Sequence, residues 1–226
     1  MLVGIPEFRL PREAIKADID YIKAVGIDIK TSCTIGKDIK FKDLEDLGYK
    51  ATFIAVGAHK SLKLDVPGED LQGVIHCIQF LRDVNLGQKP KIGKRVAVIG
   101  GGNAALDCAR VAQRMGADEV TIVYRRSRRE MPANEWEIDE AVKEGIKIDY
   151  LAAPTKIIGK DGKVTSIECV KMELGAPDAT GRRRPMPIKG SEFVTEVDTV
   201  IPAVSQAPDL GNLAQEFDLE VTKWGT

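Results

Sequence analysis

The stretch Gly100–Ala105 (GGGNAA) has the residue types and spacing of a turn that binds the pyrophosphate of a dinucleotide. In the pattern G-x-G-x-x-A, Gly100 lets the chain turn tightly, Gly102 leaves room for a ligand beside the backbone, and Ala105 lets a helix pack closely on a strand. The amides at the start of that helix would bind the anion. The predicted binding residues are Gly100, Gly101, Gly102, Asn103, Ala104 and Ala105. The alternative is a tight strand–helix turn without a ligand.

A basic stretch that contains Arg125, Arg126, Arg128 and Arg129 follows the predicted strand Glu119–Tyr124. At this position a nucleotide-binding fold distinguishes NAD from NADP. An NAD site usually has a carboxylate there, but none occurs before Glu130. A 2′-phosphate would neutralise neighbouring guanidinium groups and bind them in a fork geometry. We therefore predict that Arg125 and Arg126 contact the 2′-phosphate of NADPH, with Arg129 as a third candidate, and that Arg128 faces solvent. The alternative is a solvated basic loop.

The elements that position these residues alternate between strands and helices. Turn residues and hydrophobic periodicity predict a βαβαβ run, which is half of a nucleotide-binding sheet. We therefore predict an α/β fold with a Rossmann-like parallel sheet. The predicted strands are Arg95–Ile99, Glu119–Tyr124 and Ile146–Leu151, and the predicted helices are Asn103–Met115 and the segment from Pro132 to Gly145.

Patterns outside this run predict further elements. Asp161-Gly162 indicates a hairpin turn. The predicted helices are 11–26 and Val74–Leu86, and Phe41–Leu47 is predicted as a short helical or irregular stretch. The predicted strands are Ile27–Cys33, Ala51–Ala58, Thr155–Gly159, Val164–Leu174, Phe193–Thr195 and Val197–Ala203, and Gly175–Gly190 is predicted as a long exposed loop.

Composition excludes several classes of function. Lysine and arginine total 33 against 34 acidic residues, so the net charge of -1 gives no reason to expect nucleic-acid binding. No apolar run reaches the roughly 18 residues of a membrane span, and no signal peptide is recognisable, so we expect a cytoplasmic protein. The four cysteines lack metal-site spacing and there are two histidines, so we expect no metal site. We name no catalytic residue, because no acid–base pair or nucleophile accompanies the glycine turn.

Asp107 lies four residues after Asn103, on the same face of the predicted helix. Its carboxylate either orients the glycine turn or a domain interface, or it is a plain surface group.

Five segments together resemble the NADPH-dependent glutamate synthase small (beta) subunit family. Its relatives include the flavin part of dihydropyrimidine dehydrogenase and the large subunit of the bifurcating ferredoxin:NADP oxidoreductase. The matching segments are GIPEFRLP (Gly4–Pro11), AVGAHKSLKLDVPGEDLQGV (Ala55–Val74), VAVIGGGNAALDCAR (Val96–Arg110), YRRSRREMPA (Tyr124–Ala133) and VIPAVSQAPD (Val200–Asp209).

The resemblance implies an NADPH domain inserted into an FAD-binding domain. It assigns 94–196 to the NADPH domain, 1–61 and 197–226 to a partial FAD domain, and 62–93 to a linker with a connecting helix. Val56, Gly57 and Ala58 would lie where the chain passes the flavin, and Ala203 would lie on the return strand. Family members also use iron–sulfur clusters and a large subunit or another electron-acceptor partner.

Departures from the family pattern concern the flavin. The family has an FAD-binding glycine turn before GIPEFRLP and a Gly-Asp motif after the return strand, and this sequence has neither. Ser205 replaces the usual glycine of the return motif. The sequence is therefore interpreted as an internal fragment in which FAD binding is weak or absent, with the iron–sulfur clusters in regions outside it.

Three functions follow as hypotheses. The first is the NADPH-binding part of a flavin oxidoreductase. A glutamate synthase small subunit is favoured over a related pyrimidine reductase or ferredoxin:NADP oxidoreductase. The second is a non-catalytic nucleotide-binding module. The third is a Rossmann-type transferase, which the arginine cluster disfavours.

Overall fold

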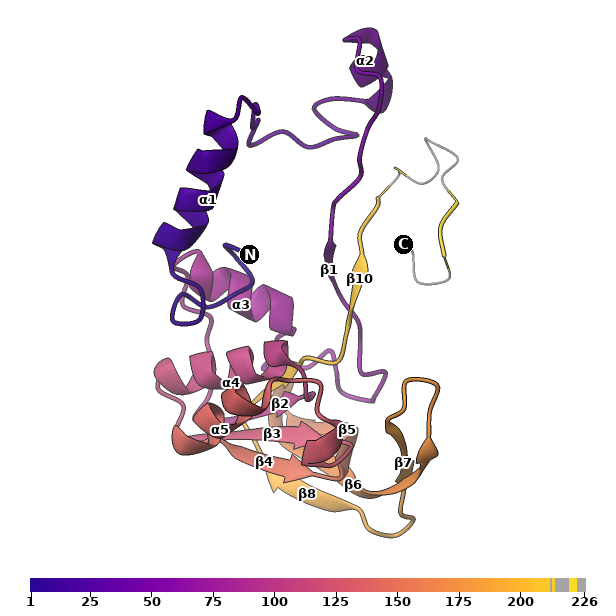
Figure 1. Ribbon diagram of the computed structural model, residues 1–226. Helices are drawn as coiled ribbons and strands as arrows, with labels where there is room; N and C mark the ends of the chain where they lie inside the picture. Colours follow the sequence, from indigo (N-terminus) through magenta and orange to yellow (C-terminus); the bar gives the residue numbers. More distant parts are fainter. Residues whose placement is uncertain (212, 214–219, 223–226) are drawn as a thin grey trace. The chain divides into compact units, whose positions relative to one another are not determined.

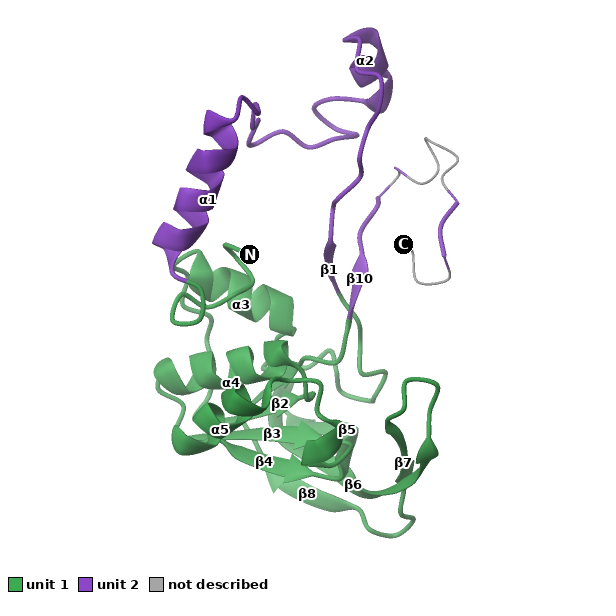
Figure 2. Cartoon of the chain, viewed as in Figure 1, with its two compact units in different colours: residues 1–10, 61–205 green, residues 11–60, 206–226 purple. Residues whose placement is uncertain are grey.

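The chain forms two compact units, which Figure 2 distinguishes by colour. The computed structural model describes residues 1–211, 213 and 220–222. Unit 1 contains Met1–Leu10 and Ser61–Ser205, and unit 2 contains Pro11–Lys60 and Gln206–Thr226. The first ten residues therefore belong to the unit with the glycine turn and not to the segment that follows them. The cofactor assignment of each predicted domain stays a prediction.

Unit 1 is built on a four-stranded parallel sheet with the order β4-β3-β2-β9 (Figure 1). This sheet confirms the predicted fold class and its strands. The first strand and the return strand, far apart in the sequence, are neighbours, with Ile99 opposite Pro202. The bounds are β2 (Arg95–Ile99), β3 (Glu119–Tyr124), β4 (Lys147–Tyr150) and β9 (Thr199–Pro202).

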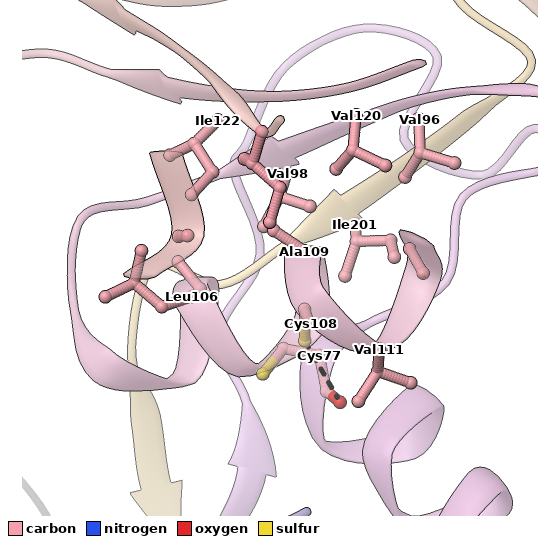
Figure 3. Close-up of a cluster of buried hydrophobic side chains, with 14 of the residues drawn as sticks. Cys77, Val96, Val98, Leu106, Cys108, Ala109, Val111, Val120, Ile122 and Ile201 are labelled. Atoms are coloured by element: carbon pink, nitrogen blue, oxygen red, sulfur yellow. Dashed lines mark hydrogen bonds between the residues drawn. The ribbon is translucent and has the colours of Figure 1, made fainter. Parts of the chain in front are cut away.

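Three helices pack on one face of this sheet. Figure 3 shows part of this packing, with labelled side chains from the strands, from α4 and from Cys77 of α3. Side chains alternate between the two faces of a strand, so Val96 and Val98 of β2 point toward the helices, where Leu106 and Ala109 meet them. All four side chains are almost fully buried. The helices, each confirming a predicted one, are α3 (Cys77–Asn85), α4 (Asn103–Arg114) and α5 (Glu135–Lys143).

An antiparallel sheet packs on the opposite face, where Ala97 and Ile99 share a buried hydrophobic cluster with Ile157 and Ile167. Its strand order is β5-β6-β7, and β8 also pairs with β6. The predicted exposed loop 175–190 is wrong in part, because β7 lies inside it. Prolines suggested a loop, but β7 is an edge strand, where a missing N–H is tolerated. The bounds are β5 (Ala152–Lys160), β6 (Lys163–Pro177), β7 (Arg183–Pro187) and β8 (Phe193–Glu196).

Unit 2 has few regular elements. The helices confirm two predictions, but the predicted strands Ile27–Cys33 and Ala51–Ala58 are wrong, and Phe53 is 91% exposed. A strand requires a hydrogen-bonded neighbour, and within the described residues only Ala58–Ser61 at the end of the second segment has one. The bounds are α1 (Arg12–Ala24), α2 (Phe41–Asp46), β1 (Ala58–Ser61) and its partner β10 (Gln206–Pro208). Of the predicted return segment 197–226, residues 212, 214–219 and 223–226 lie outside the described residues.

Candidate coenzyme site

The first two glycines of the turn are required by their neighbours in the protein. Gly100 has a φ of 149°, and a Cβ there would overlap the carbonyl oxygen of Ala203, the residue after β9. The Ala203 amide in turn donates to the Ile99 carbonyl at 2.8 Å. A Cβ on Gly101 would overlap the Tyr124 ring. These two glycines therefore let β9 and the end of β3 lie directly against the turn.

Gly102 has no such requirement. Its backbone is extended (φ -93°, ψ 173°), and a Cβ there would lie 3.9 Å from its nearest neighbour, a carbon of Pro132. It is the N-cap of α4, whose start carries no side-chain cap, and the first helical hydrogen bond runs from the Ala105 amide to the Gly102 carbonyl at 2.9 Å. Space and amide groups therefore coincide beside Gly102, as the binding of a pyrophosphate requires.

The next three residues fix the start of α4. The Asn103 side-chain oxygen accepts a hydrogen bond from the Asn134 amide at 3.1 Å, which ties the loop before α5 to this helix end. Ala104 accepts a weak bond from the Cys77 thiol at 3.8 Å, and Ala105 is fully buried in the core. The small side chain at 105 thus lets α4 pack closely, as predicted.

The loop that carries the four arginines, from Arg125 to Glu130, is held closed at both ends. The Tyr124 hydroxyl donates to the Glu130 carbonyl at 2.7 Å, and the Ser127 hydroxyl donates to the Glu130 carboxylate at 2.5 Å. A short 3-10 helix, η1 (Arg128–Glu130), closes the loop. Because the Tyr124 ring also lies against Gly101, the loop has a fixed origin next to the glycine turn.

The four arginines differ in their surroundings. Arg125 and Arg129 are exposed, and neither has a hydrogen bond or ion pair with the residues that the structure describes. Arg128 pairs with Asp139 at 2.5 Å on the surface, consistent with the prediction that it faces solvent. Arg126 is only 6% exposed. The sequence pattern grouped Arg125 with Arg126, and the structure separates them by burial.

Arg126 is held by the turn between β6 and β7. Its Nε donates to the Arg183 carbonyl at 2.7 Å and its Nη2 to Asp178 at 3.0 Å. The hydroxyl and the amide of Thr180 donate to Asp178 at 2.5 and 2.8 Å, and these hydrogen bonds lower the pKa of that carboxyl. Sequence reasoning missed Asp178, because 52 positions separate it from its partner.

Arg9 joins α4 and α5, a contact that sequence reasoning also missed. Its Nη1 lies 2.6 Å from the Asp107 carboxylate, and its Nε lies 2.6 Å from Glu137. Asp107 is therefore buried and paired, not a plain surface carboxylate. Burial raises the pKa of Asp107 to about 6, even though Arg9 acts to lower it. The segment GIPEFRLP, which contains Arg9, was the available signal.

This raised pKa predicts how stability depends on pH. The folded protein retains the Asp107 proton over a range, from pH ~4 to ~6, in which the unfolded chain has lost it. Proton uptake is then greater in the folded state, so this group makes stability fall as the pH rises through that range. Compared with an Asp107→Asn variant, the wild type should lose on the order of 3 kcal/mol of its free energy of unfolding as the pH rises between these limits. Urea unfolding of both proteins from pH 4 to 8 measures the difference, and a constant difference would contradict the burial of a costly charge.

Comparison with known proteins assigns the family. The profile of the family described as pyridine nucleotide-disulphide oxidoreductase matches residues 7–226. The chain belongs to this pyridine nucleotide-disulphide oxidoreductase family.

Curated members of this oxidoreductase family are similar along the chain. The NADPH-Fe(3+) oxidoreductase subunit beta of Geobacter sulfurreducens is 48% identical over 99% of this chain and 34% of its own length. The NADP(+)-dependent formate dehydrogenase subunit beta of Moorella thermoacetica is 46% identical over 100% of this chain and 32% of its own length. The glutamate synthase [NADPH] small chain of Azospirillum brasilense is 34% identical over 100% of this chain and 49% of its own length. The chain thus spans a third to a half of the length of these relatives.

Solved structures of oxidoreductases share the fold. FprA of Mycobacterium tuberculosis, solved in complex with NADPH, aligns with a TM-score of 0.74 at 20% identity over 92% of this chain and 62% of its own. Thioredoxin reductase of Lactococcus lactis aligns with a TM-score of 0.55 at 25% identity over 75% of this chain and 48% of its own. These likenesses support the α/β fold class.

The residues predicted to contact flavin fall in both units. Val56, Gly57 and Ala58 are exposed in unit 2, and Gly57 has a φ of 68°. Ala203 is half-buried in unit 1, against the glycine turn. Their role at a flavin stays a prediction.

The described residues lack both a metal-binding cluster and a helix that could span a membrane. Residues 1–211, 213 and 220–222 contain no group of three or more histidine, cysteine or acidic side chains placed to hold a metal ion. Within the same ranges, no helix has both the length and the apolar composition needed to cross a bilayer.

Proposed function

We propose that this chain is the NADPH-binding part of a flavin-dependent oxidoreductase. The observation that carries the proposal is that Gly102, at the uncapped start of α4, has room for a Cβ and is not required by a contact within the protein. The neighbouring glycines are explained by contacts within the protein, and Gly102 is explained by a ligand. Its amide and the helix N-terminus would bind the coenzyme pyrophosphate.

Arg125 would provide the preference for NADPH over NADH. Its side chain is exposed at the end of β3, next to the strand that leads into the glycine turn, and the residues that the structure describes leave it unpaired. Arg129 lies on the same loop and is a second donor. Arg126 would act with its guanidinium held by Asp178, so it offers less to a ligand than Arg125.

If both cofactors are bound, NADPH would supply a hydride and FAD would accept it and release electrons singly. Val56, Gly57, Ala58 and Ala203 would face the flavin, which the family membership and the resemblance of the sequence favour. The protein groups orient the two rings, so no acid–base residue is required. Iron–sulfur clusters would lie in parts of the protein outside this chain.

Two classes of electron acceptor are candidates. The resemblance of the motifs favours a glutamate synthase small subunit, which serves a large subunit. The identities of 48% and 46% favour the beta subunits named for Fe(3+) reduction and for formate dehydrogenase over the small chain at 34%. Either way we propose a partner subunit that receives the electrons, in the cytoplasm.

Anaerobic titration tests this function in the protein isolated from its native cells. The full-length protein should be yellow, and NADPH should bleach its flavin absorbance, whereas NADH should act only at much higher concentration. A colourless protein that still binds NADPH would replace the oxidoreductase with a nucleotide-binding module. The subunit that co-purifies identifies the acceptor class.

A further inference from the structure

The first ten residues are docked on the helices of unit 1. The Phe8 ring lies 4.8 Å from the Arg110 guanidinium and 4.2 Å from that of Arg114, both on α4. The Val3 carbonyl accepts a hydrogen bond from the Asn85 side chain of α3 at 3.0 Å. This segment is therefore a fixed part of the unit that carries the glycine turn.

Arg9 places its charge between two buried carboxylates on different helices. The side chains of Asp107 on α4 and Glu137 on α5 are 5% and 3% exposed, and Arg9 is 22% exposed. Two buried carboxylates this close repel each other when both are ionised, and the guanidinium compensates them with separate nitrogens. Arg9 thereby holds the start of α5 against α4.

A chain of hydrogen bonds leads from this pair to the glycine turn. The second Glu137 oxygen accepts from the Asn134 side chain at 3.2 Å. The Asn134 amide donates to the Asn103 side chain at 3.1 Å, and Asn103 is the first residue of α4. The same loop carries Pro132, the residue nearest to the open space at Gly102.

We propose that Arg9 is a positioning residue for the coenzyme site. Through Glu137 and Asn134 it fixes the loop 131–134 against the start of α4, so that the space beside Gly102 keeps one shape when the pyrophosphate is absent. This proposal rests on the proposed binding of NADPH at that turn. A site that is already ordered binds more tightly, because less conformational freedom is lost on binding.

Calorimetry on the full chain tests the proposal with Arg9→Gln. NADPH should bind about tenfold more weakly, with the preference over NADH retained, since the 2′-phosphate contacts are untouched. The matched control is Arg95→Gln, because Arg95 also bridges two carboxylates, Asp198 and Glu196, but at the opposite end of β2. It should cost less stability, because Arg95 is 37% exposed and Glu196 78% exposed, and it should leave NADPH binding unchanged. A folded Arg9→Gln chain with wild-type affinity overturns the proposal.

A second variant keeps the test decisive if Arg9→Gln does not fold. Asn134→Ala removes the side-chain hydrogen bond between the loop and the Glu137 carboxylate, and it should weaken binding by a similar factor. Where both single variants fold, the double variant should lose no more than either one, because all three break the same connection. Wild-type affinity in Asn134→Ala overturns the proposal.

Amide exchange separates this proposal from the proposed function. If the wild-type chain does not bind NADPH, the coenzyme assignment fails, but the link itself is still measurable. The Asn134 amide, protected by Asn103, should exchange faster in Arg9→Gln than in Arg95→Gln at equal global stability. Equal exchange in the two variants would show that Arg9 does not hold the loop.

Discussion

Replacing Arg125 with alanine should weaken NADPH binding at least tenfold and leave NADH binding nearly unchanged. One hydrogen bond between charged groups contributes about 1.5–3 kcal/mol, which corresponds to roughly a ten- to hundredfold change in affinity. Arg125 is exposed, so screening by salt brings the expected effect toward the lower limit. NADH lacks the 2′-phosphate and therefore has nothing for this side chain to bind.

The loop itself provides the control for this prediction. Arg128→Ala removes one positive charge three positions away, but that side chain pairs with Asp139, so it should change NADPH and NADH binding equally and little. Adding Arg126→Ala to Arg125→Ala should deepen the loss for NADPH and also lower stability, because Arg126 is buried and its removal leaves Asp178 without that partner. Calorimetric titrations with both coenzymes that show equal losses for Arg125→Ala would remove the 2′-phosphate assignment.

A single methyl group at Gly102 should abolish or strongly reduce coenzyme binding in a chain that remains folded. Alanine fits there sterically, since the nearest neighbour of its Cβ would be a carbon 3.9 Å away, and the backbone is in an ordinary extended conformation. At an N-cap, alanine instead of glycine costs about 1 kcal/mol or less. The methyl group would fill the space proposed for the pyrophosphate, so we expect affinity for NADPH and NADH to fall together, each by tenfold or more.

The neighbouring glycine is the matched control. Gly101→Ala would drive its Cβ into the Tyr124 ring, so this variant should lose several kcal/mol of stability, as overpacked sites do, typically ~1–3 kcal/mol or more. Urea unfolding and calorimetry on both variants separate stability from binding. Normal coenzyme affinity in folded Gly102→Ala would mean that the space beside this residue is not the pyrophosphate site.

The core of the parallel sheet was predictable because β2 and β3 are each followed in the sequence by a turn and a helix. The strand Arg95–Ile99, the glycine turn and the helix that begins at Asn103 are consecutive, and local patterns of period 2 and 3.6 define them with their bounds. The position of the glycine turn, at the end of β2 next to β3, follows from this order alone.

Long-range pairing was not predictable. The apolar run Ala51–Ala58 has the composition of a buried strand, but composition does not reveal whether a neighbour exists, and the described residues supply one only at its end. Arg126 and Arg125 are adjacent in the sequence and were grouped for that reason. Which of them is buried depends on Asp178 of a distant hairpin, a contact that no local pattern records.

The membership of Met1–Leu10 in unit 1 has a consequence for how this unit is held together. The chain leaves unit 1 after Leu10 and returns at Ser61, so the docked decapeptide closes a loop of fifty residues. Closing such a loop costs roughly 3–4 kcal/mol of chain entropy, which the contacts of Phe8 and Arg9 must offset. These contacts therefore hold together two parts of unit 1 that are separated by fifty residues of the sequence.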